Sequence, residues 1–189
     1  GMFSIGDWRW TSNAKGYFYD STGQPVKSYG KNADTGKVEV VHASGLQTAD
    51  HASMKINLKD VRVGGSAQTT AFLGTDFRVN KDIRLGIDYR FQGRNYADWA
   101  FSSSDILLNG EKSYASPWRI PSAHLFDLNG SYRFRLGSVN ATLVGNINNV
   151  FNQEYISDAI DGASHNDRTA YGIFYGFGRT YSVNLKLNF

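Results

Sequence analysis

Ser122, His124 and Asp127 lie close together in the sequence and are the residue types of a nucleophilic triad. In such a triad the histidine accepts the proton of the serine hydroxyl, and the aspartate orients the imidazole. The residues around them alternate between apolar and polar, which predicts a strand. Successive side chains of a strand point to opposite faces, so Ser122 and His124 share a face and Asp127 lies on the other. The three groups do not converge, and we predict no catalytic residues and no enzyme activity.

Metal and cofactor chemistry finds little support in the sequence. The chain has no cysteine, which excludes disulfides, thiolate metal sites and a thiol nucleophile. Its four histidines are His42, His51, His124 and His165. They show no spacing typical of metal ligands. One polar stretch holds His165 together with Asp161, Asp167 and Arg168. We interpret that stretch as a solvated loop and predict no metal and no cofactor.

Aromatic residues are abundant, with 11 Tyr, 12 Phe and 4 Trp. Tyr and Trp rings combine an apolar body with a polar tip, so they suit membrane interfaces as well as ligand sites. We interpret most of them as packing or as an interfacial girdle. The long polar stretch 95–120 contains the four rings that we predict to contact a ligand, namely Tyr96, Trp99, Tyr114 and Trp118.

The charge distribution argues against nucleic-acid binding. The net charge is +3 and the pI about 9.1, but Lys and Arg are scattered along the chain. A nucleic-acid surface needs its basic residues concentrated on one face. We therefore predict no nucleic-acid partner.

The elements that position these residues are predicted to be strands. Apolar and polar residues alternate regularly in five segments, 69–79, 83–92, 124–136, 139–151 and 179–189. Near the start, one strand face is predicted to hold Trp8, Trp10, Ala14, Gly16 and Phe18. Further strands are predicted within 38–41 and 54–63. No segment shows a sustained helical period, so we predict an all-β fold of about seven to nine strands.

The connections between the predicted strands are of two lengths. Three are short turns, at 20–24, 79–82 and 135–138. Three are long, at roughly 30–66, 95–120 and 152–178. Short and long connections alternate along the chain. This order predicts an antiparallel up-and-down sheet with its short turns at one end and its long loops at the other.

Strand length distinguishes a membrane barrel from a soluble one. About ten residues at ~3.3 Å each, tilted by roughly 40°, span about 25 Å, which is the apolar band of a membrane barrel. The opposite face is predicted to be charged and to suit a wet lumen, with Arg84, Asp88, Arg90, Asp127, Arg133 and Arg135. We therefore predict a transmembrane-type β-barrel or part of one. The alternative is a soluble closed barrel of the lipocalin type.

Several motifs resemble one family. NINNVFNQEYISDA (146–159) resembles the C-terminal signature of TonB-dependent outer-membrane receptors. IPSAHLFDLNGSYRF (120–134) is similar to the strand before that signature, and GRTYSVNLKLNF (178–189) is similar to the closing strand with its terminal Phe. Three more stretches resemble the Bacteroidetes branch of the family: RVGGSAQTTAFLGTDFRV, GIDYRFQGRNYADW and GDWRW. The resemblance covers nearly the whole chain.

The resemblance implies a transport function. Such receptors are barrels of about 22 strands filled by an N-terminal plug, and TonB supplies the energy for importing a bulky nutrient such as an iron–siderophore. Residues 1–189 would be the C-terminal part of such a barrel in the outer membrane, without a plug. The expected partners are membrane lipid and the missing plug and strands of the same receptor, with TonB reached only through the plug.

Two other functions remain open on the sequence. The chain could be a small autonomous outer-membrane barrel with a structural or adhesion role, because about eight strands can close a barrel. It could also be an outer-membrane barrel enzyme. Within the motif, we interpret Asn146, Asn148 and Asn149 as hydrogen-bonding groups in the lumen or at the start of a loop, and not as substrate ligands.

Overall fold

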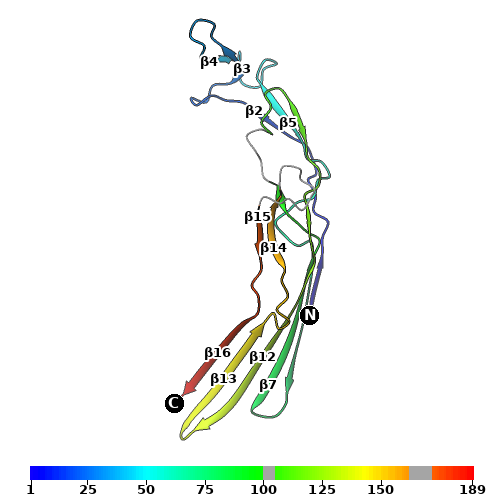
Figure 1. Ribbon diagram of the computed structural model, residues 1–189, viewed down its shortest axis with the longest axis vertical. Helices are drawn as coiled ribbons and strands as arrows, with labels where there is room; N and C mark the ends of the chain where they lie inside the picture. Colours follow the sequence, from blue (N-terminus) through cyan, green and yellow to red (C-terminus); the bar gives the residue numbers. More distant parts are fainter. Residues whose placement is uncertain (100–104, 162–171) are drawn as a thin grey trace. The chain divides into compact units, whose positions relative to one another are not determined.

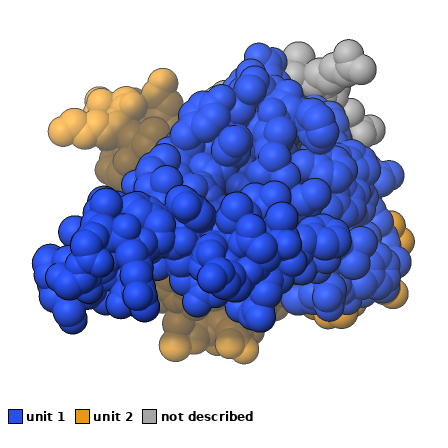
Figure 2. Space-filling model, turned by 90° about the horizontal axis from the view of Figure 1, so that it is seen from below, with its two compact units in different colours: residues 1–8, 64–99, 117–189 blue, residues 9–63, 100–116 orange. Residues whose placement is uncertain are grey.

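The computed structural model describes residues 1–99, 105–161 and 172–189. Its regular elements are strands, so the all-β prediction is confirmed. The chain forms two compact units (Figure 2). Unit 1 comprises residues 1–8, 64–99 and 117–189, and unit 2 comprises residues 9–63 and 100–116. No helix in the described ranges is long and apolar enough to cross a membrane.

Unit 1 is built on a six-stranded antiparallel sheet in the order β1-β6-β7-β12-β13-β16 (Figure 1). Its strands are β1 (Met2–Ile5), β6 (Thr69–Arg78), β7 (Ile83–Gly93), β12 (Ala123–Leu136), β13 (Val139–Asn148) and β16 (Thr180–Asn188). The five strands predicted from regular alternation are confirmed, each within a few residues of its expected bounds. Alternation predicted them well because the pairing is continuous and unbulged along all five.

Short turns join β6 to β7 and β12 to β13 at the same end of this sheet, as predicted (Figure 1). In the first turn the Asn80 side-chain oxygen accepts the backbone N–H groups of Asp82 and Ile83, both at 2.8 Å. In the second turn Gly137 adopts a φ of 63°, which a tight hairpin requires and which most L-residues avoid. The long connections of the sheet therefore all leave from its other end.

The sheet is open. β1 pairs only with β6 and β16 pairs only with β13, so β1 and β16 are its two edges. No closed barrel forms among the described residues, which answers for this chain a question that the sequence had left open. The physical reason is strand number, because about eight strands are the practical minimum for closing a barrel and this sheet has six.

The strand predicted through Trp8, Trp10, Ala14, Gly16 and Phe18 is present only over Ala14–Tyr17 and is wrong at Trp8 and Trp10. β1 ends at Ile5, and the next strand, β2 (Ala14–Tyr17), belongs to unit 2. Gln68 holds the chain where it leaves the sheet. Its side-chain oxygen accepts the N–H of Trp8 at 3.2 Å, and its amide donates to the Trp8 carbonyl at 3.1 Å. Because Trp8 and Gln68 are 60 residues apart, the alternation of neighbouring residues cannot predict this contact.

The two faces of the sheet differ in chemistry. We call one the apolar face, and its exposed large side chains are Phe3, Ile5, Leu73, Phe77, Leu85, Ile87, Leu128, Tyr132, Leu136, Leu143, Tyr181, Val183, Leu185 and Leu187. We call the other the polar face, and it includes Asp76, Arg84, Asp88, Arg90, Asp127, Asn129, Arg133, Asn146, Asn148, Ser182, Asn184 and Lys186. The predicted separation of apolar and charged residues is confirmed.

Beyond its main sheet, unit 1 holds short strands around a small core. They are β8 (Asn95–Tyr96), β9 (Asp98–Trp99), β11 (Arg119–Ile120), β14 (Ile156–Asp161) and β15 (Gly172–Tyr175). Ala97, Ile120 and Ala159 form the core, and Trp118 and Ile156 pack against it. β14 pairs antiparallel with β15 but parallel with β9, so strict up-and-down order ends here.

Unit 2 contains two small sheets. One has the order β10-β5-β2, where β5 is Ser53–Asn57 and β10 is Glu111–Ser113. The other pairs β3 (Val26–Lys31) with β4 (Val38–His42). The strands expected within 38–41 and 54–63 are thus present, although β5 stops at Asn57. The predicted turn at 20–24 is also present, with Asp20 accepting the N–H of Thr22 at 2.8 Å, but it belongs to unit 2 and joins no strands of the six-stranded sheet, contrary to the predicted up-and-down order.

Candidate functional site

The four predicted ligand-contacting rings occupy different environments. Tyr96 lies in β8 and is only 8% exposed, and the half-buried Trp118 packs on the Ala97 core beside it. The Ala97 N–H donates to the Trp118 carbonyl at 2.9 Å, which ties these two segments together. The Trp99 side chain lies outside the description. Contact of these rings with a ligand stays a prediction.

Tyr114 belongs to unit 2 and is 6% exposed. Burial, and after it the negative charge of Asp105, raises the pKa of the Tyr114 phenol to about 12. Asp105 is in turn paired with Lys112, whose Nζ lies 2.6 Å from Oδ1. Tyr114 is therefore a neutral group in a small charged cluster under ordinary conditions.

Asp161 departs from the expected solvated loop. It is fully buried, and its Oδ2 accepts the N–H of Trp118 at 2.7 Å. The sequence does contain a signal for this burial, because Asp161 lies two residues after the buried Ala159 and so on the same side of the strand. His165, Asp167 and Arg168 lie outside the described residues.

Asp98, also in this part of unit 1, has a shifted pKa. The pKa of Asp98 is raised, first by burial and then by the negative charge of Asp158. No group of three or more His, Cys, Asp or Glu side chains in the described ranges could hold a metal ion. The perturbation therefore does not by itself mark a metal site.

A cluster of polar side chains joined by an ion pair and a hydrogen bond lies where the polar face meets the long connections. We call it the loop-base cluster, and it consists of Arg90, Asp127 and Asn149. An Arg90 Nη2 lies 2.8 Å from Asp127 Oδ2, and the backbone N–H of Asn149 donates to Asp127 Oδ1 at 2.8 Å. Asp127 thus joins β7, β12 and the end of β13. The three residues stand far apart in sequence, and only the sheet register brings them together.

Asn149 links two segments, the one that follows β13 and the one that precedes β16. Its side-chain amide donates to the carbonyls of Gln153, at 2.9 Å, and Phe177, at 3.2 Å. Its side-chain oxygen accepts the Gln153 N–H at 2.9 Å. Asn149 is 3% exposed and has a φ of 51°, a conformation that Asn tolerates better than most residues. The interpretation of this residue as a hydrogen-bonding group at the start of a loop is confirmed.

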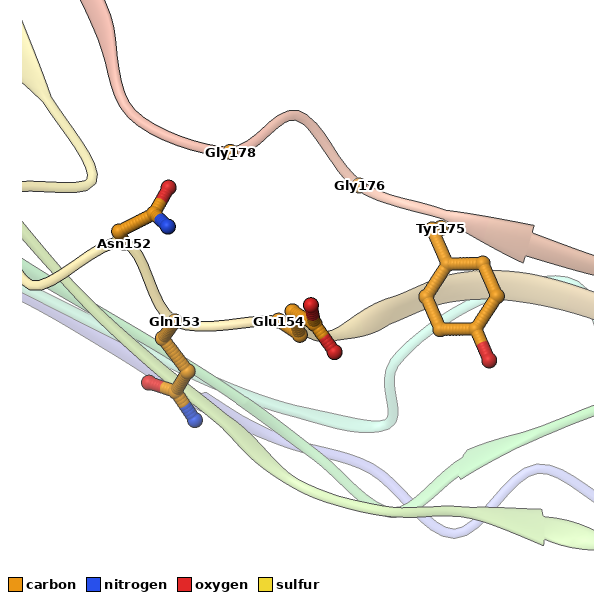
Figure 3. Close-up of a pocket in the computed structure, with 6 residues that line it drawn as sticks. All are labelled: Asn152, Gln153, Glu154, Tyr175, Gly176 and Gly178. Atoms are coloured by element: carbon orange, nitrogen blue, oxygen red, sulfur yellow. The ribbon is translucent and has the colours of Figure 1, made fainter.

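Two neighbouring pockets flank this linkage and share Gly178. One, of about 470 Å³, opens on the polar face and includes Arg90, Asn148, Tyr155 and Phe177 among its lining residues. The other, of about 340 Å³, is lined by Asn152, Gln153, Glu154, Tyr175, Gly176 and Gly178 (Figure 3). Both are small and open, and they offer amide, phenol and carboxylate groups for hydrogen bonds to a polar ligand.

Figure 3 shows how the smaller pocket is made. The segment with Asn152 and Glu154 faces the segment with Gly176 and Gly178, and the Asn152 side chain points across toward the glycines. The Asn152 oxygen accepts the N–H of Arg179 at 2.9 Å. At Gly176 an added Cβ would collide with the ring of Tyr155, so any other residue there would displace that ring.

Ser122, His124 and Asp127 do not form a catalytic triad in the structure. His124 lies on the apolar face, where its Nδ1 is 2.9 Å from the Tyr89 hydroxyl. Asp127 lies on the polar face, paired with Arg90. The prediction that alternation separates these two side chains is confirmed.

Comparisons with known proteins identify no relative of this chain. Neither the family models, nor the curated proteins, nor the solved structures include a match to this chain. A functional proposal therefore depends on the chain's own residues. The most extensive chemical feature among the described residues is the pair of opposite faces, one apolar and one polar, of the six-stranded sheet.

Proposed function

We propose that this chain is the C-terminal part of an outer-membrane β-barrel receptor of the TonB-dependent kind, which imports a bulky nutrient such as an iron–siderophore. The observation that supports the proposal is the exposed apolar face. On the edge strand β16, Val183 and Leu185 are 71% and 55% exposed, and neighbouring strands continue the same surface. Water-soluble chains rarely expose a contiguous apolar surface of this breadth.

Lipid is the partner that fits this surface. β6 and β13 have 10 residues each and β7 has 11. A tilted strand of about ten residues spans the apolar band of ~25 Å found in membrane barrels. A hydrocarbon environment removes the cost of exposing these side chains to water.

The polar face would line the lumen. Its charged groups are partly satisfied within the sheet, for example by Arg90–Asp127 and by the Asn129 amide donating to Asp88 at 3.2 Å. The loop-base cluster holds the long connections beside the two small pockets. In the proposed receptor, the half-buried Trp118 of unit 1 is a ring that can contact the nutrient, whereas Tyr96 and Tyr114 are 8% and 6% exposed and offer it little surface.

The open edges support a larger assembly. An unpaired strand edge offers a row of N–H and C=O groups to another strand. β1 and β16 would pair with the remaining strands of the receptor barrel, while the plug would fill the lumen and contact TonB. The proposal thus gives both edges a partner.

Membrane partition tests the lipid-facing surface. The urea-unfolded chain is diluted into phospholipid vesicles, and flotation through a density gradient separates the bound fraction. We expect the folded chain to float with the vesicles and to resist extraction by high salt. A monodisperse monomer that stays in plain buffer would contradict the proposal.

The coding sequence upstream of Met2 tests the receptor assignment separately. We expect an in-frame plug domain and further strand repeats. A signal peptide directly before Met2 would instead indicate the small autonomous barrel with a structural or adhesion role.

A further inference from the structure

His124 is an exception on the apolar face. Among the described residues of that face in the six-stranded sheet, it is the only side chain of the types His, Asp, Glu, Lys and Arg. It is exposed and is the first residue of β12 on that face. A single polar base on an otherwise apolar surface needs a partner, because hydrocarbon offers its ring nitrogens no hydrogen bond.

Its surroundings fix the orientation of the ring. The Tyr89 hydroxyl lies 2.9 Å from Nδ1, and the two rings stack with centroids 6.2 Å apart. Phe91 contacts the imidazole from the same strand as Tyr89, with ring centroids at 4.9 Å. The other ring nitrogen, Nε2, has no hydrogen-bond partner among the residues that the structure describes. It is therefore available to a group outside the chain.

The position along the strand indicates what that group is. From His124 to Leu136, the last residue of β12, the chain advances 136 − 124 = 12 residues. At ~3.3 Å per residue and a tilt of roughly 40°, this is about 30 Å across the membrane, a few ångströms more than the apolar band of about 25 Å in membrane barrels. If the turn end of the sheet lies at one interface, His124 lies at the other, at the level of the head groups.

We propose that His124, oriented by Tyr89, binds the phosphate of a membrane lipid head group through Nε2. A phosphate oxygen accepts a hydrogen bond from the imidazole N–H, and the aromatic rings of Tyr89 and Phe91 fill the boundary between head group and acyl chain. This inference rests on the proposed function, because it requires the apolar face to lie in lipid. Tyr89 acts as the positioning residue.

Solid-state NMR on the full chain in phosphatidylglycerol–phosphatidylcholine vesicles tests the site. Histidine is labelled with ¹⁵N, and dephasing of the imidazole signals by lipid ³¹P is measured. We expect one dephased signal, lost in His124→Gln, while the remaining histidine signals stay undephased. Tyr89→Phe keeps the ring of residue 89 but removes the hydroxyl, and we expect partial loss of dephasing at His124.

The outcomes separate this inference from the proposed function. Flotation of the chain without dephasing at His124 would overturn the lipid site and leave the membrane location intact, whereas failure to float would overturn both. A second arm uses phosphate-free maltoside micelles with added inorganic phosphate. Dephasing there equal to that in vesicles would show a soluble-anion site and contradict the lipid assignment. No dephasing there, with dephasing in vesicles, supports it.

Discussion

At the residue scale, Asn149 is the side chain whose loss should cost most. Asn149→Ala removes three side-chain hydrogen bonds from a buried position and leaves the Gln153 and Phe177 carbonyls without their donor. Such losses cost about 2–4 kcal/mol of unfolding free energy. We expect a lower denaturant midpoint and faster proteolysis in the two connected segments.

The neighbouring Asn148 provides a matched control for Asn149. It is exposed, and its side chain donates one hydrogen bond, to the Thr180 hydroxyl at 3.1 Å. Asn148→Ala should therefore cost less than about 1 kcal/mol. Equal losses for the two variants would show that Asn149 does not hold the segments together.

Tyr114 gives a prediction on pH. Its phenol pKa is raised from 10.0 to about 12 by burial and by Asp105, so the folded state retains the proton that the unfolded state loses. Stability contributed by the neutral phenol is present below pH 10 and is lost as the pH rises toward 12. Subtracting the tyrosinate absorbance titration of Tyr114→Phe from that of the parent chain should isolate a step near pH 12. A step near pH 10 would contradict burial of Tyr114.

At the element scale, β16 allows the two faces to be compared on adjacent residues. Leu185 lies on the apolar face opposite Leu143, and Asn184 lies on the polar face opposite Val144. Leu185→Arg would place a charge against lipid at a cost of about 2–4 kcal/mol near the midplane. Asn184→Arg should be nearly neutral. Denaturant titration of vesicle-inserted protein measures both, and equal effects would contradict a one-sided lipid surface.

Alternation predicted the long strands because it is a local property of consecutive residues, and the observed pairing of β12 with β7 and β13 keeps the apolar residues of all three strands on one face. It failed where distant residues decide. After β1 ends, the chain is held by a hydrogen bond between Gln68 and Trp8, 60 residues apart in sequence. Asp161 is buried where it accepts a hydrogen bond from the distant Trp118. The loop-base cluster was likewise only partly foreseeable, because the asparagine motif is visible in sequence but its contact with Asp127 requires the fold.

At the scale of the whole molecule, strand alternation alone did not determine closure. Regular alternation predicts that strands pair side by side, but it says nothing of whether the first meets the last. The six-stranded sheet of unit 1 leaves β1 and β16 unpaired on their outer sides. Every described residue of β16 is exposed, so an exposed apolar surface lies beside an unpaired strand edge.

Self-association is the expected consequence of these edges when the chain is studied alone. Exposed apolar edge strands pair with other chains, so we expect dimers or larger species by native mass spectrometry in micelles. Val183→Lys and Leu185→Lys together place two charges on the β16 edge and should shift the distribution toward monomer. The matched control, Ser182→Lys with Asn184→Lys, adds the same charge to the polar face of β16. If both pairs disperse the assemblies equally, net charge and not the apolar edge governs association; if the parent chain is a monomer, its edges are satisfied within a single copy.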